Sequence, residues 1–207
     1  MSSPLPQSPV ANLAAVPHWL NLANLLTLSR LVLAFVLFGL MAFEMWIVSL
    51  GVFGVAAFTD WLDGYVARRQ GLVSSLGRVL DPLVDKVLIC GAFVFLLPLG
   101  TKEGWLLPWM VTVVIARELI ISGLRDQLES MGAAFGADML GKIKMTLQCA
   151  ALIAIFVALE AQGRSGIGIV PQELALIRDF LIWAMVLATV LSGANYLVRL
   201  ATPSAKS

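Results

Sequence analysis

The chain reads Thr59-Asp60-Trp61-Leu62-Asp63-Gly64-Tyr65-Val66-Ala67-Arg68-Arg69 at the end of one long apolar stretch and Gly77-Arg78-Val79-Leu80-Asp81-Pro82-Leu83-Val84-Asp85-Lys86 at the start of the next. A membrane-spanning helix needs about 20 apolar residues, because the hydrocarbon core is roughly 30 Å thick and a helix rises about 1.5 Å per residue. Both stretches are long enough to be consecutive spans. The acidic segment between them then lies at one membrane face.

The composition of the whole chain agrees with a membrane protein. Of its 207 residues, 59% are hydrophobic and 13% are charged, and the mean hydropathy is +0.91. These values are too apolar for a soluble domain of this length, so membrane lipid is the expected solvent. The formal net charge of +1 argues against nucleic acid as a partner, because nucleic-acid binding usually calls for a strongly basic surface.

Six apolar stretches are long enough to cross a membrane. They cover residues 24–43, 45–69, 77–97, 105–128, 140–159 and 174–200. We therefore expect an all-α, polytopic membrane protein whose six transmembrane helices form one catalytic domain over residues 18–200. A short interfacial helix at His18 and Trp19 should precede the first span. Residues 1–17 should be a loosely ordered N-terminal segment and residues 201–207 a C-terminal tail.

The basic residues predict the orientation in the membrane. The connections from the second to the third span and from the fourth to the fifth collect Arg68, Arg69, Arg78, Arg125, Lys142 and Lys144. The opposite connections hold chiefly Lys102 and Arg164. Because cytoplasmic loops carry an excess of Lys and Arg, the acidic segment and both termini should face the cytoplasm. The expected location is a bacterial-type inner membrane.

The aspartates fall on two helical stripes. At about 100° per residue, one stripe of the second helix carries Asp60, Asp63, Gly64 and Ala67. Asp81 and Asp85, one turn apart, share a face of the third helix. A helical hairpin can point both stripes into one pocket.

Four carboxylates in that position call for a compensating charge. Each costs roughly 2.5 to 3.5 kcal/mol in the centre of a span. Mg²⁺ prefers carboxylate and phosphate oxygens, so the stripes predict a divalent-metal site. The competing interpretation is that the acids pair with interfacial bases, namely Arg68, Arg69, Arg78 and Lys86. The regular spacing of the acids, and the few bases on the inward stripe, favour the metal site.

The same segment resembles the motif of the CDP-alcohol phosphatidyltransferase family. The pattern Asp60-x2-Asp63-Gly64-x2-Ala67-Arg68-x8-Gly77-x3-Asp81-x3-Asp85 matches that motif without a gap or substitution. The resemblance implies a six-helix membrane fold, usually a homodimer, with two Mg²⁺ or Mn²⁺ ions between the motif helices. It implies transfer of the phosphatidyl group of CDP-diacylglycerol to an alcohol, with release of CMP.

The resemblance also assigns roles to residues. It implies that Asp60, Asp63 and Asp81 are metal ligands and that Asp85 is both a shared ligand and the general base. It assigns CDP binding to Asp60, Gly64, Ala67, Arg68 and Gly77, together with Asn24 and Thr27 near the start of the first span.

A second group of cations predicts the acceptor alcohol. Arg117, Arg125, Lys142 and Lys144 lie near the same expected cytoplasmic mouth and suit an acceptor that already carries a phosphate. The competing interpretations are an internal pair between Arg117 and Glu118, and lysines that only anchor the helix at the interface. Two residues apart on a regular helix, the lysines project about 200° from one another, so both should reach one ligand only where the helix is irregular.

These segments resemble the branch of the family that uses glycerol 3-phosphate. The likeness rests on Asn24-Leu25-Leu26-Thr27-Leu28-Ser29-Arg30, on Ala116-Arg117-Glu118 with Arg125, and on Gly141-Lys142-Ile143-Lys144. Ala23 and Met145 depart from the usual pattern, where proline and threonine are common.

Other functions stay open at this point. Serine and inositol phosphate are the alternative acceptors. A metal-dependent intramembrane prenyltransferase would also use aspartate-rich sites, and a cation transporter could line a pathway with acids.

Overall fold

The computed structural model describes residues 22–70, 75–130, 139–164 and 169–201, and in those ranges it contains six α-helices. It describes their side chains except those of residues 22–24, 60–70, 75–79, 81, 129, 130 and 201. The helices are α1 (Leu22–Ala42), α2 (Trp46–Gln70), α3 (Ser75–Glu103), α4 (Pro108–Ser130), α5 (Met139–Arg164) and α6 (Gln172–Ala201). Each expected apolar stretch corresponds to one helix. The expected interfacial helix and both terminal segments lie outside the described residues.

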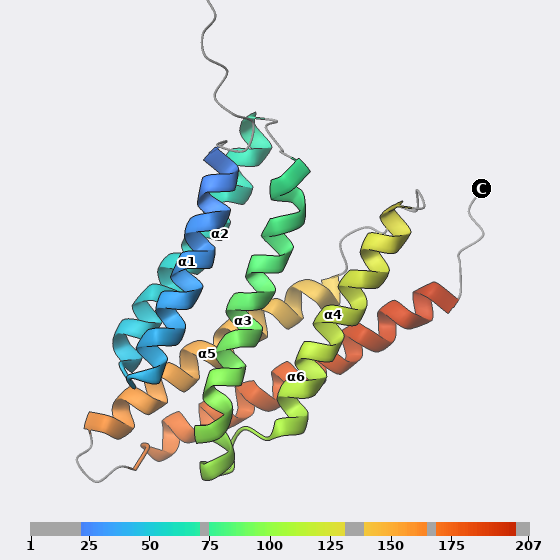
Figure 1. Ribbon diagram of the computed structural model, residues 1–207. Helices are drawn as coiled ribbons and strands as arrows, with labels where there is room; N and C mark the ends of the chain where they lie inside the picture. Colours follow the sequence, from blue (N-terminus) through green and yellow to red (C-terminus); the bar gives the residue numbers. More distant parts are fainter. Residues whose placement is uncertain (1–21, 71–74, 131–138, 165–168, 202–207) are drawn as a thin grey trace, which may run out of the picture.

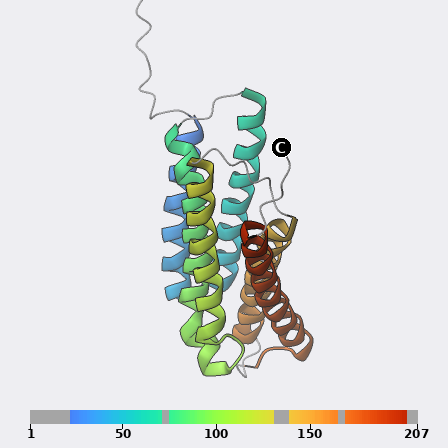
Figure 2. The ribbon, with the colours of Figure 1, turned by 90° about the vertical axis from the view of Figure 1, so that its right-hand side faces the viewer.

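The helices form two groups. In Figure 1, the axes of α1 to α4 are roughly parallel and successive helices run in opposite directions, whereas α5 and α6 cross them obliquely. Figure 2 shows the α5–α6 pair on one side of the other helices. Helix α1 packs against both α2 and α3, and α5 also contacts both of these motif helices. Helix α4 packs against α3 and α6. The two motif helices therefore border an interior that α1 and α5 also line.

The described helices are those of a polytopic membrane protein. Segments of α1, α3, α5 and α6 are long and apolar enough to cross a membrane, and they cover Leu25–Ala42, Pro82–Glu103, Met139–Arg164 and Gln172–Leu200. The described apolar part of α2 is shorter, Trp46–Thr59. The described part of α4 is less apolar, because Arg117 and Glu118 lie near its middle and Arg125 and Asp126 near its end. Glu118 is buried and the Arg117 side chain is 14% exposed, so these two charges face the protein interior, whereas Leu119 and Ile120 of the same helix are exposed.

Close packing joins α1 to α3. Lipid offers no hydrophobic driving force between helices, so small residues that let backbones approach are important for association. Ala34 and Ala92 are fully buried, and a Cβ on Gly91 would lie only 2.2 Å from Cζ of Phe38. The Phe38 ring, which stacks on Phe95 with centroids 5.0 Å apart, therefore occupies space that a side chain at position 91 would take. Glycine at this position permits the contact.

Candidate active site

The motif lies at the facing ends of α2 and α3. Helix α2 continues to Gln70 and α3 begins at Ser75, so the motif backbone is helical on both sides of the connection, as expected. Among the proposed metal and CDP ligands, the side chains of Asn24, Asp60, Asp63, Gly64, Ala67, Arg68, Gly77 and Asp81 lie outside the described part of the structure. Those of Thr27 and Asp85 are described. The metal and CDP-binding roles therefore stay predictions.

Asp85 is held by an arginine from the first helix. Nη1 of Arg30 donates a hydrogen bond to Oδ1 of Asp85 over 2.9 Å. The Arg30 side chain is 1% exposed and that of Asp85 is 25% exposed, and Thr27, one turn before Arg30 on α1, is also buried. A charged side chain that is buried in a membrane protein is costly unless it is paired. The bond thus stabilises both charges and fixes one oxygen of the Asp85 carboxylate.

Arg30→Met should destabilise the protein by about 3 kcal/mol, because it removes the cation from a buried pair and leaves the carboxylate in place. The matched control is Arg164→Met, which breaks an i,i+4 pair with Glu160 whose arginine is 72% exposed and should cost less than about 1 kcal/mol. Unfolding of both variants in mixed micelles by SDS titration measures the two free energies. Equal losses would show that the Arg30 pair contributes no more than a surface pair.

Two adjoining cavities border Asp85. One, of about 150 Å³, is lined by residues of four helices, among them Arg30 of α1, Phe53 of α2 and Cys149 of α5. The other, of about 160 Å³, lies toward α4 and α5 and is lined by Glu118 and Lys144 as well. Ile89 and Met145 border both cavities. Asp85 therefore faces space that both the motif helices and the cation-bearing helices enclose.

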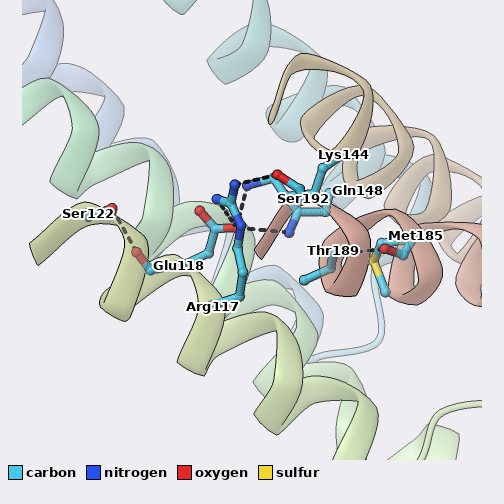
Figure 3. Close-up of polar contacts among 8 residues, drawn as sticks. All are labelled: Arg117, Glu118, Ser122, Lys144, Gln148, Met185, Thr189 and Ser192. Carbon is cyan, nitrogen blue, oxygen red and sulfur yellow. Dashed lines mark hydrogen bonds and ion pairs between the residues drawn. The ribbon is translucent and has the colours of Figure 1, made fainter. Parts of the chain in front are cut away.

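Glu118 is the centre of a buried polar network between α4, α5 and α6 (Figure 3). Its Oε1 accepts hydrogen bonds from Nζ of Lys144 and from Nε2 of Gln148 at 3.5 Å. Nη1 of Arg117 lies 3.5 Å from the same oxygen, and Nη2 of Arg117 donates to Oγ of Ser192 over 2.6 Å. One carboxylate thus gathers two cations, and Arg117 extends the network to α6.

The four cations predicted to bind an acceptor phosphate border one pocket. It has a volume of about 450 Å³, and its lining includes Arg117, Arg125, Lys142 and Lys144. Among its described lining residues, Lys86 adds a fifth cation, whereas Glu118 and Asp126 are the acids. The excess of positive charge suits a phosphate dianion. Glu118, Lys144 and Met145 also line the 160 Å³ cavity that Asp85 borders. These residues form a wall shared by that cavity and the cationic pocket.

The two lysines reach this pocket in different ways. Helix α5 starts at Met139, so Lys142 and Lys144 both belong to it, yet both line the pocket. Lys142 is exposed, whereas Lys144 is 5% exposed and bound to Glu118. Their long stems allow one to approach from the rim and the other from the interior, although they leave the helix in different directions. An irregular helix is therefore not required, contrary to our expectation.

The sequence pointed to Arg117 and Lys144, and to Glu118 as a partner of Arg117, but not to the bond from Lys144 to Glu118 or to the contacts of Gln148 and Ser192. The pair between Arg117 and Glu118, weighed as an alternative to a phosphate-binding role, is present at 3.5 Å while Arg117 also borders the pocket. A signal for Arg30 was present, because an arginine inside an apolar span needs a partner. Gln148 and Ser192 gave no signal, since single small or neutral polar residues are ordinary in membrane helices.

Known proteins resemble this chain over most of its length. The family model described as CDP-alcohol phosphatidyltransferase matches residues 20–192. A protein of Bacillus subtilis (strain 168) is 34% identical over 193 residues, covering 85% of this chain and 93% of that protein. One of Sodalis glossinidius is 34% identical over 82% of this chain and 90% of its own length, and one of Rickettsia felis is 29% identical over 87% and 92%. All three are named CDP-diacylglycerol-glycerol-3-phosphate 3-phosphatidyltransferase. The chain belongs to the CDP-alcohol phosphatidyltransferase family.

Proposed function

We propose that the protein transfers the phosphatidyl group of CDP-diacylglycerol to glycerol 3-phosphate and releases phosphatidylglycerol phosphate and CMP. The observation that carries this proposal is the shared wall between the Asp85 cavity and the cationic pocket. A carboxylate that can accept a proton lies next to a pocket that suits a phosphate. An alcohol that bears a phosphate at one end and a hydroxyl at the other fits this arrangement. The names of the relatives support the same acceptor.

In the proposed reaction the cationic pocket holds the acceptor's phosphate and Asp85 acts on its hydroxyl. Asp85 accepts the hydroxyl proton while the oxygen forms a bond to the phosphorus that bears diacylglycerol. The bond from that phosphorus to the CMP oxygen breaks, and CMP leaves with the electron pair. Arg30 fixes the direction of the Asp85 carboxylate through its 2.9 Å bond, which lowers the entropy cost of aligning base and hydroxyl. No covalent enzyme intermediate is needed.

The donor set of the motif fits divalent cations. Four carboxylates at the ends of α2 and α3 supply the hard oxygen ligands that Mg²⁺ and Mn²⁺ prefer, and the described one, Asp85, borders a cavity. We assign Asp60, Asp63, Asp81 and Asp85 to two such ions. When bound, the ions would neutralise the diphosphate oxygens of CDP-diacylglycerol. We assign the CDP moiety to Asp60, Gly64, Ala67, Arg68, Gly77, Asn24 and Thr27.

The acceptor is tested by competition between alcohols. Purified enzyme in lipid nanodiscs is given CDP-diacylglycerol and labelled glycerol 3-phosphate, serine or inositol phosphate. It should use glycerol 3-phosphate with a kcat/KM at least about tenfold above the others. The excess positive charge of the pocket disfavours serine, and the names of the relatives favour glycerol 3-phosphate over inositol phosphate. Thin-layer separation of the labelled lipid measures each product. Preference for serine or inositol phosphate would contradict the assignment.

The same assay separates the proposal from other enzyme classes. Turnover of a prenyl pyrophosphate with none of CDP-diacylglycerol would favour an intramembrane prenyltransferase. Metal uptake into proteoliposomes without lipid synthesis would favour a cation transporter. Membership of the CDP-alcohol phosphatidyltransferase family argues against both.

The membrane arrangement completes the proposal. We assign a membrane crossing to each of the six helices, α2 and α4 included, because both are at least 23 residues long and their polar residues can face the protein interior. The cationic pocket places Arg125, Lys142 and Lys86 at one end of the bundle, so we assign that end and both termini to the cytoplasmic side of a bacterial-type inner membrane. A homodimer is the expected assembly from the family resemblance.

A further inference from the structure

Arg117 is tied to α6 by a short hydrogen bond that no motif predicted. Its Nη2 donates to Oγ of Ser192 over 2.6 Å. The Ser192 residue is fully buried, and the Arg117 side chain is 14% exposed. Hydrogen bonds from a charged donor are shorter and stronger than those between neutral groups. The bond therefore restrains a guanidinium that borders the acceptor pocket.

The second interaction of Arg117, with Glu118, is weaker. Glu118 is its chain neighbour, and adjacent residues on a helix project about 100° apart, so their side chains do not naturally face one another. The distance from Nη1 of Arg117 to Oε1 of Glu118 is 3.5 Å, and the same oxygen also accepts from Lys144. Lys144 of α5 therefore competes with Arg117 for this carboxylate oxygen. Ser192 is left as the partner that fixes the direction of Arg117.

Two glycines lie close to the arginine, near that serine. A Cβ on Gly193 would lie 3.4 Å from Cγ of Arg117, and a Cβ on Gly141 would lie 4.0 Å from its Nη2. The stem of Arg117 thus passes α6 where that helix has no side chain, and its tip lies next to the start of α5. Gly141 lines the same pocket as the guanidinium. The Arg117 side chain therefore lies between Ser192-Gly193 of α6 and Gly141 at the start of α5.

We propose that Ser192 is a positioning residue that holds Arg117 toward the phosphate of the acceptor alcohol, so that α6 takes part in acceptor selection through a neutral hydroxyl. This inference rests on the proposed function of the cationic pocket. The acceptor concerned is a small alcohol that carries a phosphate monoester. Ser192 itself does not touch the reacting atoms, and its effect on binding passes through Arg117.

The test compares two buried hydroxyls on the same helix. Ser192→Ala in the full-length enzyme should raise the KM for glycerol 3-phosphate about tenfold, as expected for loss of a hydrogen bond to a charged group, with kcat and the KM for CDP-diacylglycerol within about twofold of wild type. The matched control is Thr189→Val, because Thr189 is fully buried and, in the described part of the structure, donates to the carbonyl of Met185 in its own helix. Its kinetic constants should stay at wild-type values.

A double-mutant cycle checks that the effect passes through the arginine. In an Arg117→Met background, Ser192→Ala should cause no further rise in the KM for glycerol 3-phosphate, because contacting residues are coupled and their effects do not add. An undiminished effect in that background would overturn the inference. Ser192→Thr, which keeps the hydroxyl, should restore a KM near wild type.

The remaining outcomes are also decisive. If Ser192→Ala does not fold, Ser192→Cys replaces it, and the weaker acceptor sulfur should still raise the KM for glycerol 3-phosphate. If Ser192→Ala matches Thr189→Val in every constant, or lowers kcat alone, Ser192 has no positioning role. A wild-type enzyme that does not use glycerol 3-phosphate would instead refute the proposed function, so the two failures are distinguishable.

Discussion

Replacing Asp85 with asparagine should reduce turnover by at least about a thousandfold while binding of CDP-diacylglycerol is largely retained. General bases contribute roughly 10² to 10⁴ to rate, and asparagine has a similar shape but cannot accept the hydroxyl proton. Asp85 is the proposed base because its carboxylate borders both interior cavities and is oriented by Arg30. Initial rates with saturating substrates measure kcat, and a fluorescent CDP-diacylglycerol analogue measures binding.

Asp179→Asn is the matched control for this substitution. Asp179 is also paired with an arginine, Arg178, at 2.8 Å, but its side chain is 45% exposed and belongs to the first part of α6. Its conversion to asparagine should leave kcat unchanged. Near-normal turnover in Asp85→Asn would refute the base role, and loss of CDP-diacylglycerol binding would assign Asp85 to substrate binding instead.

Removal of divalent cations should lower turnover to the background rate. The motif gathers four aspartates at the ends of two helices, and in the described structure Arg30 bonds one of them. Bringing the diphosphate of CDP-diacylglycerol to these carboxylates without cations would place like charges together, which is unfavourable in a low-dielectric interior. Incorporation of labelled glycerol 3-phosphate into lipid, measured before and after dialysis against EDTA, tests this expectation.

Adding back the metal distinguishes loss of activity caused by chelation from loss caused by damage to the protein. Mg²⁺ or Mn²⁺ in excess over EDTA should restore the rate, and EDTA supplied already saturated with Mg²⁺ should have no effect. Full activity after complete chelation would contradict the metal assignment of Asp60, Asp63, Asp81 and Asp85. The acceptor comparison would still stand, because it depends on the cationic pocket.

Much of the fold could be predicted because the solvent is lipid. An apolar stretch of sufficient length in a membrane protein has few alternatives to a helix, since backbone groups must be satisfied within the segment. Each of the six stretches accordingly corresponds to one helix, with ends that differ by a few residues. The oblique path of α5 and α6 could not be predicted, because crossing angles depend on which side chains meet where the helices touch.

The candidate site was predictable where the residues themselves are unusual. Arg117 and Lys144 indicate a site because charge is costly inside a membrane span. In the structure both line one pocket. Their partners depend on which helices are neighbours, and that information is tertiary. Glu118 could be read only as a neighbour of Arg117, although its buried Oε1 also accepts from Lys144 of α5. The contact from Ser192 spans 75 positions of the chain, beyond any local pattern.

The packing of Phe38 over Gly91 has a consequence for the Arg30–Asp85 bond. Phe38 follows Arg30 by about two turns of α1, and Gly91 follows Asp85 by nearly two turns of α3. The Phe38 ring packs against Gly91 and opposes sliding of α1 along α3. One residue of axial slip is about 1.5 Å, which is about half the length of the Arg30–Asp85 bond. The contact between Phe38 and Gly91 therefore holds the two helices in the register that this bond requires.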